Sequence, residues 1–507
     1  MSLSETAVPW LEWSTESFTK AKAEDKPILL FVTATWCPWC RQMDRLNYND
    51  KEIISIINEH FVPIRVDADR RPDIFERYNL GGLPTTAFLN AQGEILCGGT
   101  YVSRERLPDA LHHVVTAYRT RQDEIDERVA DLLTNRRSDI DVMCTVDVKP
   151  ERGFEVADWV QTNLSDDFDS VYGGFGVSPK FTHAEALQFL LDRYREAPDD
   201  WLRHALTLTL DSMGWSQVYD ELDGGFFSHA LAQDWTNPQL EKQLDTNANL
   251  LRVYLDGCRV LDCHRFRERA EDIIRYVQAQ LSDPIAGGFF SSQYADEEYY
   301  QRSTADARFA VPSPLVDKTL YVDANALMVS AYISASESLD DVTLRDFAIL
   351  SLERVLLETY RPGFGVAHHH GGVRGLLLDQ IRAIDALLDV WEVTENDLYT
   401  ELAEELMHYC LRVLWDKEEG GFFDRDPSSG QVPGSDAGQV GLLSQRFKPF
   451  LGNCAAANAL LRLGRASGDL TFRPKAMPTL RSQSSVYRRQ GPSSAAYARA
   501  ALNVYPS

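Results

Sequence analysis

The chain has 507 residues, of which 44% are hydrophobic and 25% charged, and because one ordinary hydrophobic core does not extend over such a length, we expect at least two domains. Its 51 basic and 76 acidic side chains leave a formal charge of −25, which repels phosphate backbones and anionic membranes and argues against a nucleic-acid-binding protein. No apolar run reaches the roughly 18 residues of a membrane span, and residues 1–13 lack the basic start and apolar middle of a secretory signal, so we expect a cytoplasmic protein without a membrane partner.

The first elements along the chain predict a βαβ unit. Lys26–Val32 is a short apolar run with a proline near its start, which is typical of a buried strand. The sequence Trp36-Cys37-Pro38-Trp39-Cys40 follows directly. Residues 53–57 place isoleucines on one helical face, and Phe61–Val66 is a second apolar run. Strand, helix and strand in this order are typical of a parallel βαβ unit.

A strand pair and a helix complete the first domain. Gly81–Leu89 and Glu94–Leu96 flank a turn and predict the two strands, and Leu107–Tyr118 has the apolar spacing of an amphipathic helix. We expect this helix to continue into the charged stretch that ends at Leu133, before a polar segment over Asn135–Arg152. The sequence therefore predicts a first domain over residues 1–120, a helical extension and linker over 121–152, and a second domain over 153–507.

The second domain is predicted to be helical and repetitive. Its helices have apolar residues at alternating steps of four and three, as in Leu377–Trp391. Between helices a glycine pair followed by Phe recurs at intervals of roughly 50 to 75 residues. The copies are Gly173-Gly174-Phe175, Gly224-Gly225-Phe226, Gly287-Gly288-Phe289, the shorter Gly363-Phe364, and Gly420-Gly421-Phe422. This repetition predicts helical hairpins around a closed ring, although ordinary helix termination also uses glycine.

Two of the eight cysteines stand at redox spacing. Cys37 lies between a predicted strand and a helix start, where the helix dipole and free backbone N–H groups favour a thiolate nucleophile. Cys40 lies one helical turn later and can resolve a mixed disulfide. Two packed core cysteines are the alternative. A structural zinc site would need a second ligand pair, which does not follow this motif.

Pro84 precedes an apolar strand, where a cis Leu83-Pro84 bond would turn the backbone of Leu83 toward the cysteines and leave it open for substrate pairing. This proline and the cysteine motif, with Trp36 and Trp39 as supporting residues, together resemble the thioredoxin fold.

A narrower resemblance extends over nearly the whole chain, to the spermatogenesis-associated thioredoxin-like family. The resemblance implies a multidomain protein in which an α/β thioredoxin-like fold precedes an all-α (α/α)6 toroid akin to sugar epimerases and six-hairpin glycosidases. The residues that carry it are Cys37, Trp39, Cys40 and Met43; Asn58–Val62; Val66-Asp67 with Arg71–Asp73; Gly98–Tyr101; Gly173–Phe175 with Pro179–Phe181; Gly224–Phe226; Glu241-Lys242; Asn247-Ala248; and Asp296.

The chain also departs from these families. Relatives often have His beside each cysteine and Trp before the cis proline, where this chain has Pro38, Arg41 and Leu83. Ordinary thioredoxins have a buried acid six residues before the first cysteine, and this position is Phe31. Proton transfer must therefore differ, and reduction, oxidation and isomerisation all stay open.

For the toroid, the resemblance implies a central cavity ringed by loops at one mouth. Carboxylate pairs there could cleave a glycosidic bond, and histidine pairs could move a proton beside a sugar carbonyl. Each such residue has a helix cap or a loop hydrogen bond as its alternative. The polar candidates are His183, Glu185, Asp223, His229, Glu241, Asp245, Asp296 and Asp323, and the aromatic ones, for which core packing is the alternative, are Trp215, Phe226, Trp235 and Phe289.

We expect no metal and no cofactor besides a redox-active Cys37–Cys40 disulfide. The run His368-His369-His370 is a candidate for a metal site, but adjacent side chains on a loop seldom converge on one ion.

Three functional hypotheses follow. The first is a thiol-disulfide oxidoreductase module fused to a toroid that binds an unknown substrate or partner; its partners would be protein thiols or a thioredoxin-type reductant, with a sugar or small molecule in the toroid. The second is a carbohydrate-active enzyme with a regulatory thioredoxin domain. The third is a scaffold without catalysis.

Overall fold

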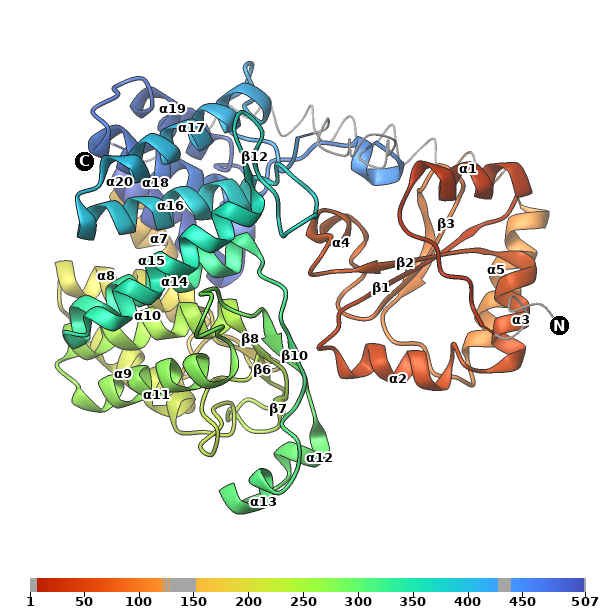
Figure 1. The fold of residues 1–507 in the computed structure, drawn as a ribbon, viewed down its shortest axis with the longest axis horizontal. Helices are drawn as coiled ribbons and strands as arrows, with labels where there is room; N and C mark the ends of the chain where they lie inside the picture. Colours follow the sequence, from red (N-terminus) through yellow and green to blue (C-terminus); the bar gives the residue numbers. More distant parts are fainter. Residues whose placement is uncertain (1–6, 122–123, 125–126, 128–151, 427–438, 506–507) are drawn as a thin grey trace. The chain divides into compact units, whose positions relative to one another are not determined.

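The computed structural model describes residues 7–121, 124, 127, 152–426 and 439–505, and the predicted linker lies almost wholly outside these ranges. The chain divides into two compact units (Figure 1), one formed by Met1–Val146 with Arg425–Phe447 and the other by Asp147–Asp424 with Lys448–Ser507. Among the described residues, every helix is too short or too polar to span a membrane.

The first unit contains a four-stranded sheet in the order β2-β1-β3-β4. Strand β1 (Ile28–Thr33) runs parallel to β2 (Val62–Asp67) and antiparallel to β3 (Thr85–Leu89). Strand β4 (Ile95–Gly99) pairs antiparallel with β3. The predicted βαβ unit and strand pair are both confirmed, and together they give the expected thioredoxin-like sheet.

Helices cover both faces of this sheet. Side chains of a strand alternate between faces, so Ile28, Leu30 and Val32 join one buried cluster while Leu29 and Phe31 join the other. The first cluster includes residues of α1 (Thr15–Glu24) and α4 (Pro72–Tyr78), and the second includes residues of α3 (Lys51–His60) and α5 (Leu107–Thr120). Burial on both faces explains why the strand is a continuous apolar run.

A short segment from the C-terminal half of the chain completes the first cluster. Leu442 and Leu443, in the 3-10 helix η2 (Gly441–Ser444), are buried with the residues of α1 and α4. The hydroxyl of Tyr78 accepts a hydrogen bond from the N–H of Leu442 at 2.9 Å, and Arg77 donates to the carbonyl of Leu442 at 3.0 Å. The sequence assigned all of 153–507 to the toroid, whereas residues 425–447 fold with the first unit. Local patterning does not reveal which core two leucines will join.

The second unit is a double ring of helices. Within the described residues, each inner helix packs against the next and the last packs against the first, so the ring closes. The inner helices are α8 (Ala184–Glu196), α10 (Leu244–Leu261), α14 (Val322–Leu339), α16 (Leu377–Thr394), α18 (Phe450–Ala466) and α20 (Ser494–Val504). The outer helices are α7 (Gly153–Asp166), α9 (Asp200–Gly214), α11 (His264–Gln280), α15 (Val342–Thr359), α17 (Asp397–Val413) and α19 (Arg473–Arg481). The predicted (α/α)6 toroid is confirmed.

The Gly-Gly-Phe loops join outer helices to the following inner helices, and an amide side chain fixes four of the five loops, while in the first the N–H of Gly174 donates to the hydroxyl of Thr209. Asn247 of α10 accepts from the N–H of Phe226 at 2.8 Å and donates to its carbonyl at 3.1 Å. Gly225 has a φ of +80°, and a Cβ there would overlap the ring of Tyr276. We call this pair of hydrogen bonds, one to the N–H and one to the carbonyl of the same residue, an amide bracket. The same bracket joins Asn325 to Phe289, Gln380 to Val366 and Asn453 to Phe422. The repeated motif therefore has a repeated structural role.

The loops gather at one mouth of the ring, as predicted. The first N–H groups of a helix lack partners within the helix. In this ring, the first N–H of an inner helix donates to a backbone carbonyl in the loop that leads to the next inner helix. Leu244 of α10 donates to the carbonyl of Ser291 at 2.9 Å, and Val322 of α14 donates to that of His368 at 2.9 Å. Neighbouring loops are thus tied to each other at the N-terminal ends of the inner helices.

Candidate functional site

The cysteine pair lies at the start of α2 (Pro38–Leu46), which follows β1 along the chain. Cys37 is the N-cap of this helix, and its sulfur accepts a hydrogen bond from the N–H of Cys40 at 3.2 Å. Pro38 occupies a first-turn position, where its missing N–H costs nothing. The free N–H group and the positive end of the helix dipole both favour a thiolate at Cys37.

The second thiol is also set up to ionise. Burial raises the pKa of Cys40, but hydrogen bonds with Cys37, Thr33 and the backbone of Ala34 outweigh burial, so its pKa lies below the ordinary value. Because the two thiols are hydrogen-bonded, loss of one proton leaves a thiolate that both sulfurs stabilise.

The cis proline loop packs beside the sulfurs. The Leu83-Pro84 bond is cis, as predicted, and Leu83 packs against the cluster formed by Ala34, Cys37 and Cys40. No hydrogen bond to the backbone of Leu83 occurs within the described residues, so this backbone can pair with an extended partner chain. Cys37 is only 2% exposed, so a partner must reach it past the residues that pack around it.

Tryptophans and an arginine shape this approach. Trp36 packs against the cysteines and donates from Nε1 to Asp69 at 2.7 Å. Arg41 donates to the carbonyls of Thr35 and Trp36, at 3.1 Å each, and so fixes the loop that precedes Cys37. Trp39 is 47% exposed, which leaves an aromatic surface beside the cysteines for a partner.

A hydrophobic side chain replaces the usual buried acid. Phe31 is fully buried and packs against Trp10 and Tyr48, with ring centroids 5.8 and 4.9 Å away. A carboxylate at this position would accept and release the proton of the second thiol, and Phe31 is unable to do so.

The centre of the toroid is a polar cavity of about 470 Å³ lined by all six inner helices of the described ring. Arg462 in its wall pairs with Asp389 at 2.7 Å and Glu392 at 2.9 Å. Arg252 lines the same cavity and makes no hydrogen bond or ion pair within the described residues. A cavity of this polarity suits a hydrophilic ligand better than an apolar one.

Carboxylates gather at the start of successive inner helices. Glu185 is in the first turn of α8, Asp245 in that of α10, Asp323 in that of α14 and Asp379 in that of α16. Burial, followed by the charges of Asp323 and Glu185, raises the pKa of Asp245. Burial and the charge of Asp379 likewise raise the pKa of Asp323, although His368 opposes them. These mutual effects indicate that the carboxylates of Glu185, Asp245 and Asp323 lie near one another at the N-terminal ends of the inner helices.

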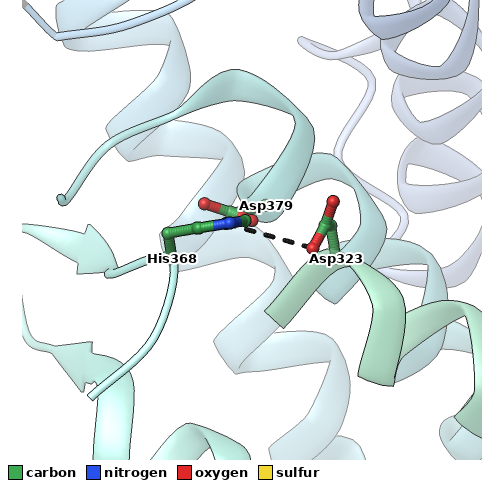
Figure 2. Close-up of side chains that lie close together, drawn as sticks. All are labelled: Asp323, His368 and Asp379. Carbon is green, nitrogen blue, oxygen red and sulfur yellow. Dashed lines mark hydrogen bonds and ion pairs between the residues drawn. The ribbon is translucent and has the colours of Figure 1, made fainter. Parts of the chain in front are cut away.

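One histidine joins this group (Figure 2). Nδ1 of His368 lies 2.9 Å from Oδ1 of Asp379 and 3.9 Å from Oδ1 of Asp323. The neighbours His369 and His370 instead contact backbone carbonyls with their Nδ1 atoms. The three histidines therefore do not converge on one point, which agrees with the expectation for adjacent residues on a loop. The first of them, His368, instead lies beside Asp323 and Asp379, which come from two other segments.

Three of the predicted residues lie together in the segments that precede α8 and α10, namely His183, His229 and Glu241. His229 stacks on Phe181 at 4.6 Å between ring centroids, and the ring of His183 lies 6.1 Å from that of the same phenylalanine. Burial lowers the pKa of both histidines. Glu241 is buried and accepts a hydrogen bond from Ser228, whose hydroxyl also contacts His229. These side chains hold the loops together.

Two more predicted residues have structural roles. Asp223 pairs with Arg308 at 2.7 Å and accepts from the hydroxyl of Tyr299 at 2.9 Å. Asp296 caps the short helix α12 (Glu297–Tyr300) by accepting from the N–H of Tyr299 at 3.0 Å. The aromatic candidates Phe226, Trp235 and Phe289 are fully buried in the core, and Trp215 packs against it.

The sequence analysis considered His368 only as part of the histidine run, and it did not identify Asp379 or the cavity arginines as site residues. One available signal is the repeat Asp245-Thr246-Asn247 and Asp323-Ala324-Asn325 at the start of two inner helices. In both copies the asparagine side chain binds the backbone of the preceding loop, and the aspartate lies two residues before it in the first helical turn.

Comparisons with known proteins agree with this architecture. Residues 2–136 match the family described as "Thioredox_DsbH: Protein of unknown function, DUF255". Spermatogenesis-associated protein 20 of Mus musculus is 27% identical over 368 residues, which cover 64% of this chain and 45% of the relative. Uncharacterized protein B0495.5 of Caenorhabditis elegans is 28% identical over 315 residues, or 57% of this chain and 41% of the relative. The chain thus spans less than half the length of these curated relatives.

A shorter match is to a protein named for thiol:disulfide interchange. Thiol:disulfide interchange protein DsbD of Ralstonia nicotianae is 32% identical over 81 residues, or 15% of this chain and 13% of that protein.

Solved structures share the fold of the second unit. Cellobiose 2-epimerase from Spirochaeta thermophila matches with a TM-score of 0.54 at 15% identity, over 69% of this chain and 96% of that one. D-mannose isomerase matches with a TM-score of 0.52 at 14% identity, over 65% and 84% of the two chains. At such identities the likeness concerns the fold alone. The chain is therefore similar to spermatogenesis-associated protein 20 and, over residues 2–136, to the DUF255 thioredoxin-like family, and its second unit shares the α/α toroid fold of a cellobiose 2-epimerase and a D-mannose isomerase.

Proposed function

We propose that this protein is a thiol-disulfide oxidoreductase in which Cys37 is the nucleophile and Cys40 the resolving thiol. The observation that carries the proposal is the position of Cys37 as the N-cap of α2, with the N–H of Cys40 donating to its sulfur. That hydrogen bond and the helix dipole stabilise the thiolate that must attack.

The reaction is a two-electron exchange. The thiolate of Cys37 attacks one sulfur of a partner disulfide, a mixed disulfide forms, and the partner's other sulfur leaves as a thiolate that takes up a proton. The thiolate of Cys40 then attacks the sulfur of Cys37, and the partner leaves as a dithiol while Cys37 and Cys40 become oxidised. The reverse sequence oxidises a partner dithiol.

The partner class follows from the surroundings of the pair. The backbone of Leu83 and the exposed ring of Trp39 can receive an extended peptide, so the partners are protein thiols or disulfides. The similarity to a protein named for thiol:disulfide interchange supports the same class. A thioredoxin-type reductant would return the disulfide to the dithiol.

Trapping of mixed disulfides in the full chain tests this proposal. Cys40→Ser should accumulate mixed disulfides with protein partners, because the attack by Cys37 remains and resolution is lost. Cys37→Ser should trap none. The matched control is Cys97→Ser, which removes an exposed cysteine of β4 and leaves the pair intact. Equal trapping by Cys37→Ser and Cys40→Ser, or wild type that neither reduces nor oxidises a protein disulfide, would exclude the redox function.

A second candidate function concerns the toroid. We infer that its cavity binds a carbohydrate or a similar polar small molecule, since charged side chains from the inner helices line it, among them Glu185 from the first turn of α8. The solved structures of similar fold include proteins named as a sugar epimerase and a sugar isomerase. The candidate residues for this binding are Glu185, Asp245 and Asp323.

Calorimetry with a panel of mono- and oligosaccharides tests this second candidate. Binding to wild type that Asp245→Asn abolishes would support a sugar site. Glu241→Gln serves as the comparison, because Glu241 is buried against Ser228. If no sugar binds while thiol exchange is intact, the toroid is a scaffold for the redox unit.

A further inference from the structure

One cluster in the second unit has the composition of a cation site. Asp323 in the first turn of α14, Asp379 in that of α16 and His368 in the loop before α16 form what we call the Asp-His-Asp cluster. One ligand atom from each residue lies within 4.8 Å of the other two. Figure 2 shows the three side chains pointing toward one another from three separate segments.

The cluster contains an unsatisfied buried acceptor. Asp379 is 1% exposed, and within the described residues its Oδ2 atom is buried without a hydrogen-bond partner. A buried carboxylate oxygen without a partner costs free energy, and such groups in proteins are normally paired or coordinate metals. A second carboxylate, from Asp323, lies 3.9 Å from the same Nδ1 atom of His368. Repulsion between two neighbouring carboxylates adds to this cost.

We propose that the Asp-His-Asp cluster binds a first-row divalent cation of the Zn²⁺ or Mn²⁺ class, through Asp323, Asp379 and Nδ1 of His368. Ligands that bind one such ion at about 2.0–2.2 Å lie about 3–3.5 Å apart. The observed separations of 2.9 and 3.9 Å from Nδ1 bracket this range. Two carboxylates and an imidazole suit borderline cations better than soft Cu(I). On binding, any proton on Nδ1 is released to solvent.

The loop architecture holds the ligands in place. The carbonyl of His368 accepts from the N–H of Val322, which precedes Asp323 at the start of α14. The imidazole stacks on Tyr321, with ring centroids 4.8 Å apart. Gln380, next to Asp379, brackets Val366 of the same loop. The ligand positions therefore exist before the ion arrives, which lowers the cost of ordering on binding.

The cluster is closed on one side and open on the other. The side chains of His368 and Asp379 are 5% and 1% exposed, whereas that of Asp323 is 28% exposed. An ion can therefore enter past Asp323 and keep positions for water or a ligand. Two neighbouring side chains also carry charge: Asp245 is negative, and Arg382 is positive and acts on Asp323. The negative charges of Asp323, Asp379 and Asp245 together exceed the single positive charge of this arginine.

Metal titration of the full chain tests the proposal. The protein carries Cys37→Ser and Cys40→Ser, so that thiolates do not bind the added metal, and is first freed of metal with a chelator. Titration with Co²⁺, followed by its visible absorption, and with Zn²⁺ and Mn²⁺ by calorimetry should give one saturable site per chain. Asp323→Asn and Asp379→Asn should each weaken binding by at least about tenfold. The matched control is Asp296→Asn, whose carboxylate caps α12 elsewhere in the unit, and its binding should be unchanged.

Two results would overturn the proposal. One is the absence of saturable binding of all three cations, which would mean that protonated His368 alone holds the two carboxylates. The other is Asp323→Asn binding as tightly as Asp296→Asn. Because Asp379 is buried and its variant could unfold, Asp323→Asn decides the matter provided that its circular dichroism and melting match the parent. Cys37 and Cys40 are both replaced in this protein, so the outcome is independent of the redox proposal.

Discussion

At the scale of single residues, the cysteine site relies on short-range contacts made by one helix end. The N-cap position of Cys37 and its bond from the N–H of Cys40 both lie within a single turn. A buried acid is absent from this site because Phe31 occupies its place in the core. Hydrogen bonds with Cys37, Thr33 and the backbone of Ala34 therefore lower the pKa of Cys40 without help from a distant carboxylate.

The first prediction concerns the pH dependence of these thiols. In the reduced full chain, with Cys97→Ser to remove an exposed thiol, thiolate absorbance in the ultraviolet should rise with a midpoint below the ordinary cysteine pKa, because hydrogen bonds lower the pKa of Cys40. The lowered pKa stabilises the folded reduced protein above the pKa of the unfolded thiol, and this contribution is lost as the pH falls through the folded pKa. A midpoint at or above the ordinary value would contradict the hydrogen-bond account.

The second prediction concerns a buried ion-pair network in the toroid. Arg308 donates to Asp220 and Asp223 at 2.7 Å each, and its side chain is 7% exposed. Arg308→Ala should lower the free energy of unfolding by about 3 kcal/mol, because it leaves carboxylates buried with less compensation. Arg345→Ala removes an exposed ion pair with Asp346 and should cost less than about 0.5 kcal/mol. Urea titrations of both variants measure the difference, and equal stability would show that Lys242 alone compensates Asp220.

At the scale of elements, the Gly-Gly-Phe loops fix the contacts between outer and inner helices. Four of the five loops meet the first turn of the following inner helix through an amide bracket, such as that between Asn247 and Phe226. The glycines are needed because the loop turns through positive φ where another element packs closely, as Gly225 does against Tyr276.

The third prediction tests this close approach. Gly225→Ala should lower stability by about 2–4 kcal/mol, since strain at positive φ adds to overlap with the ring of Tyr276. Gly371→Ala is the control: its φ is +73°, and open space surrounds the added methyl group. That variant should show only the backbone strain, about 1 kcal/mol. Thermal or urea unfolding distinguishes the two effects, and equal losses would mean that the ring moves aside at little cost.

At the scale of the whole molecule, the two units do not follow the order of the chain. The first unit takes residues 425–447 from beyond most of the toroid sequence, and Leu442 and Leu443 enter its core. A fragment that ends at residue 120 therefore lacks part of its own hydrophobic cluster, which is why the redox experiments require the full chain.

The fourth prediction follows from this shared core. Leu442→Ala should destabilise the first unit by about 2–5 kcal/mol, because removal of the leucine methyl groups leaves a cavity among residues of α1 and α4. Leu470→Ala, at a position that is 74% exposed, should have almost no effect. Thermal melting of the full chain, with recovery of thiol exchange as a second readout, compares the two variants. If both melt alike, residues 439–447 contribute no stability to the redox unit.

Much of the fold was predictable because it depends on local periodicity. The spacing of Leu377–Trp391 predicts a helix, and α16 extends over Leu377–Thr394. The apolar run over Lys26–Val32 predicts the central strand, and β1 extends over Ile28–Thr33. Such patterns depend on side-chain repeats of 3.6 and 2 residues, which neighbours in sequence fully specify.

The sequence by itself determined the cysteine pair and the cis proline, because each is a motif of a few adjacent residues, and it determined the helical ring and its loops because the Gly-Gly-Phe motif repeats along the chain. Only the tertiary structure decided which polar residues meet. Glu241 and Asp296 proved to be loop and cap residues, whereas His368, Asp323 and Asp379 come together from three segments. Closure of the ring determines which of these residues lie together, because it makes neighbours of helices that are far apart in sequence. The residue spacing within one segment carries no information about the distance of that segment from another.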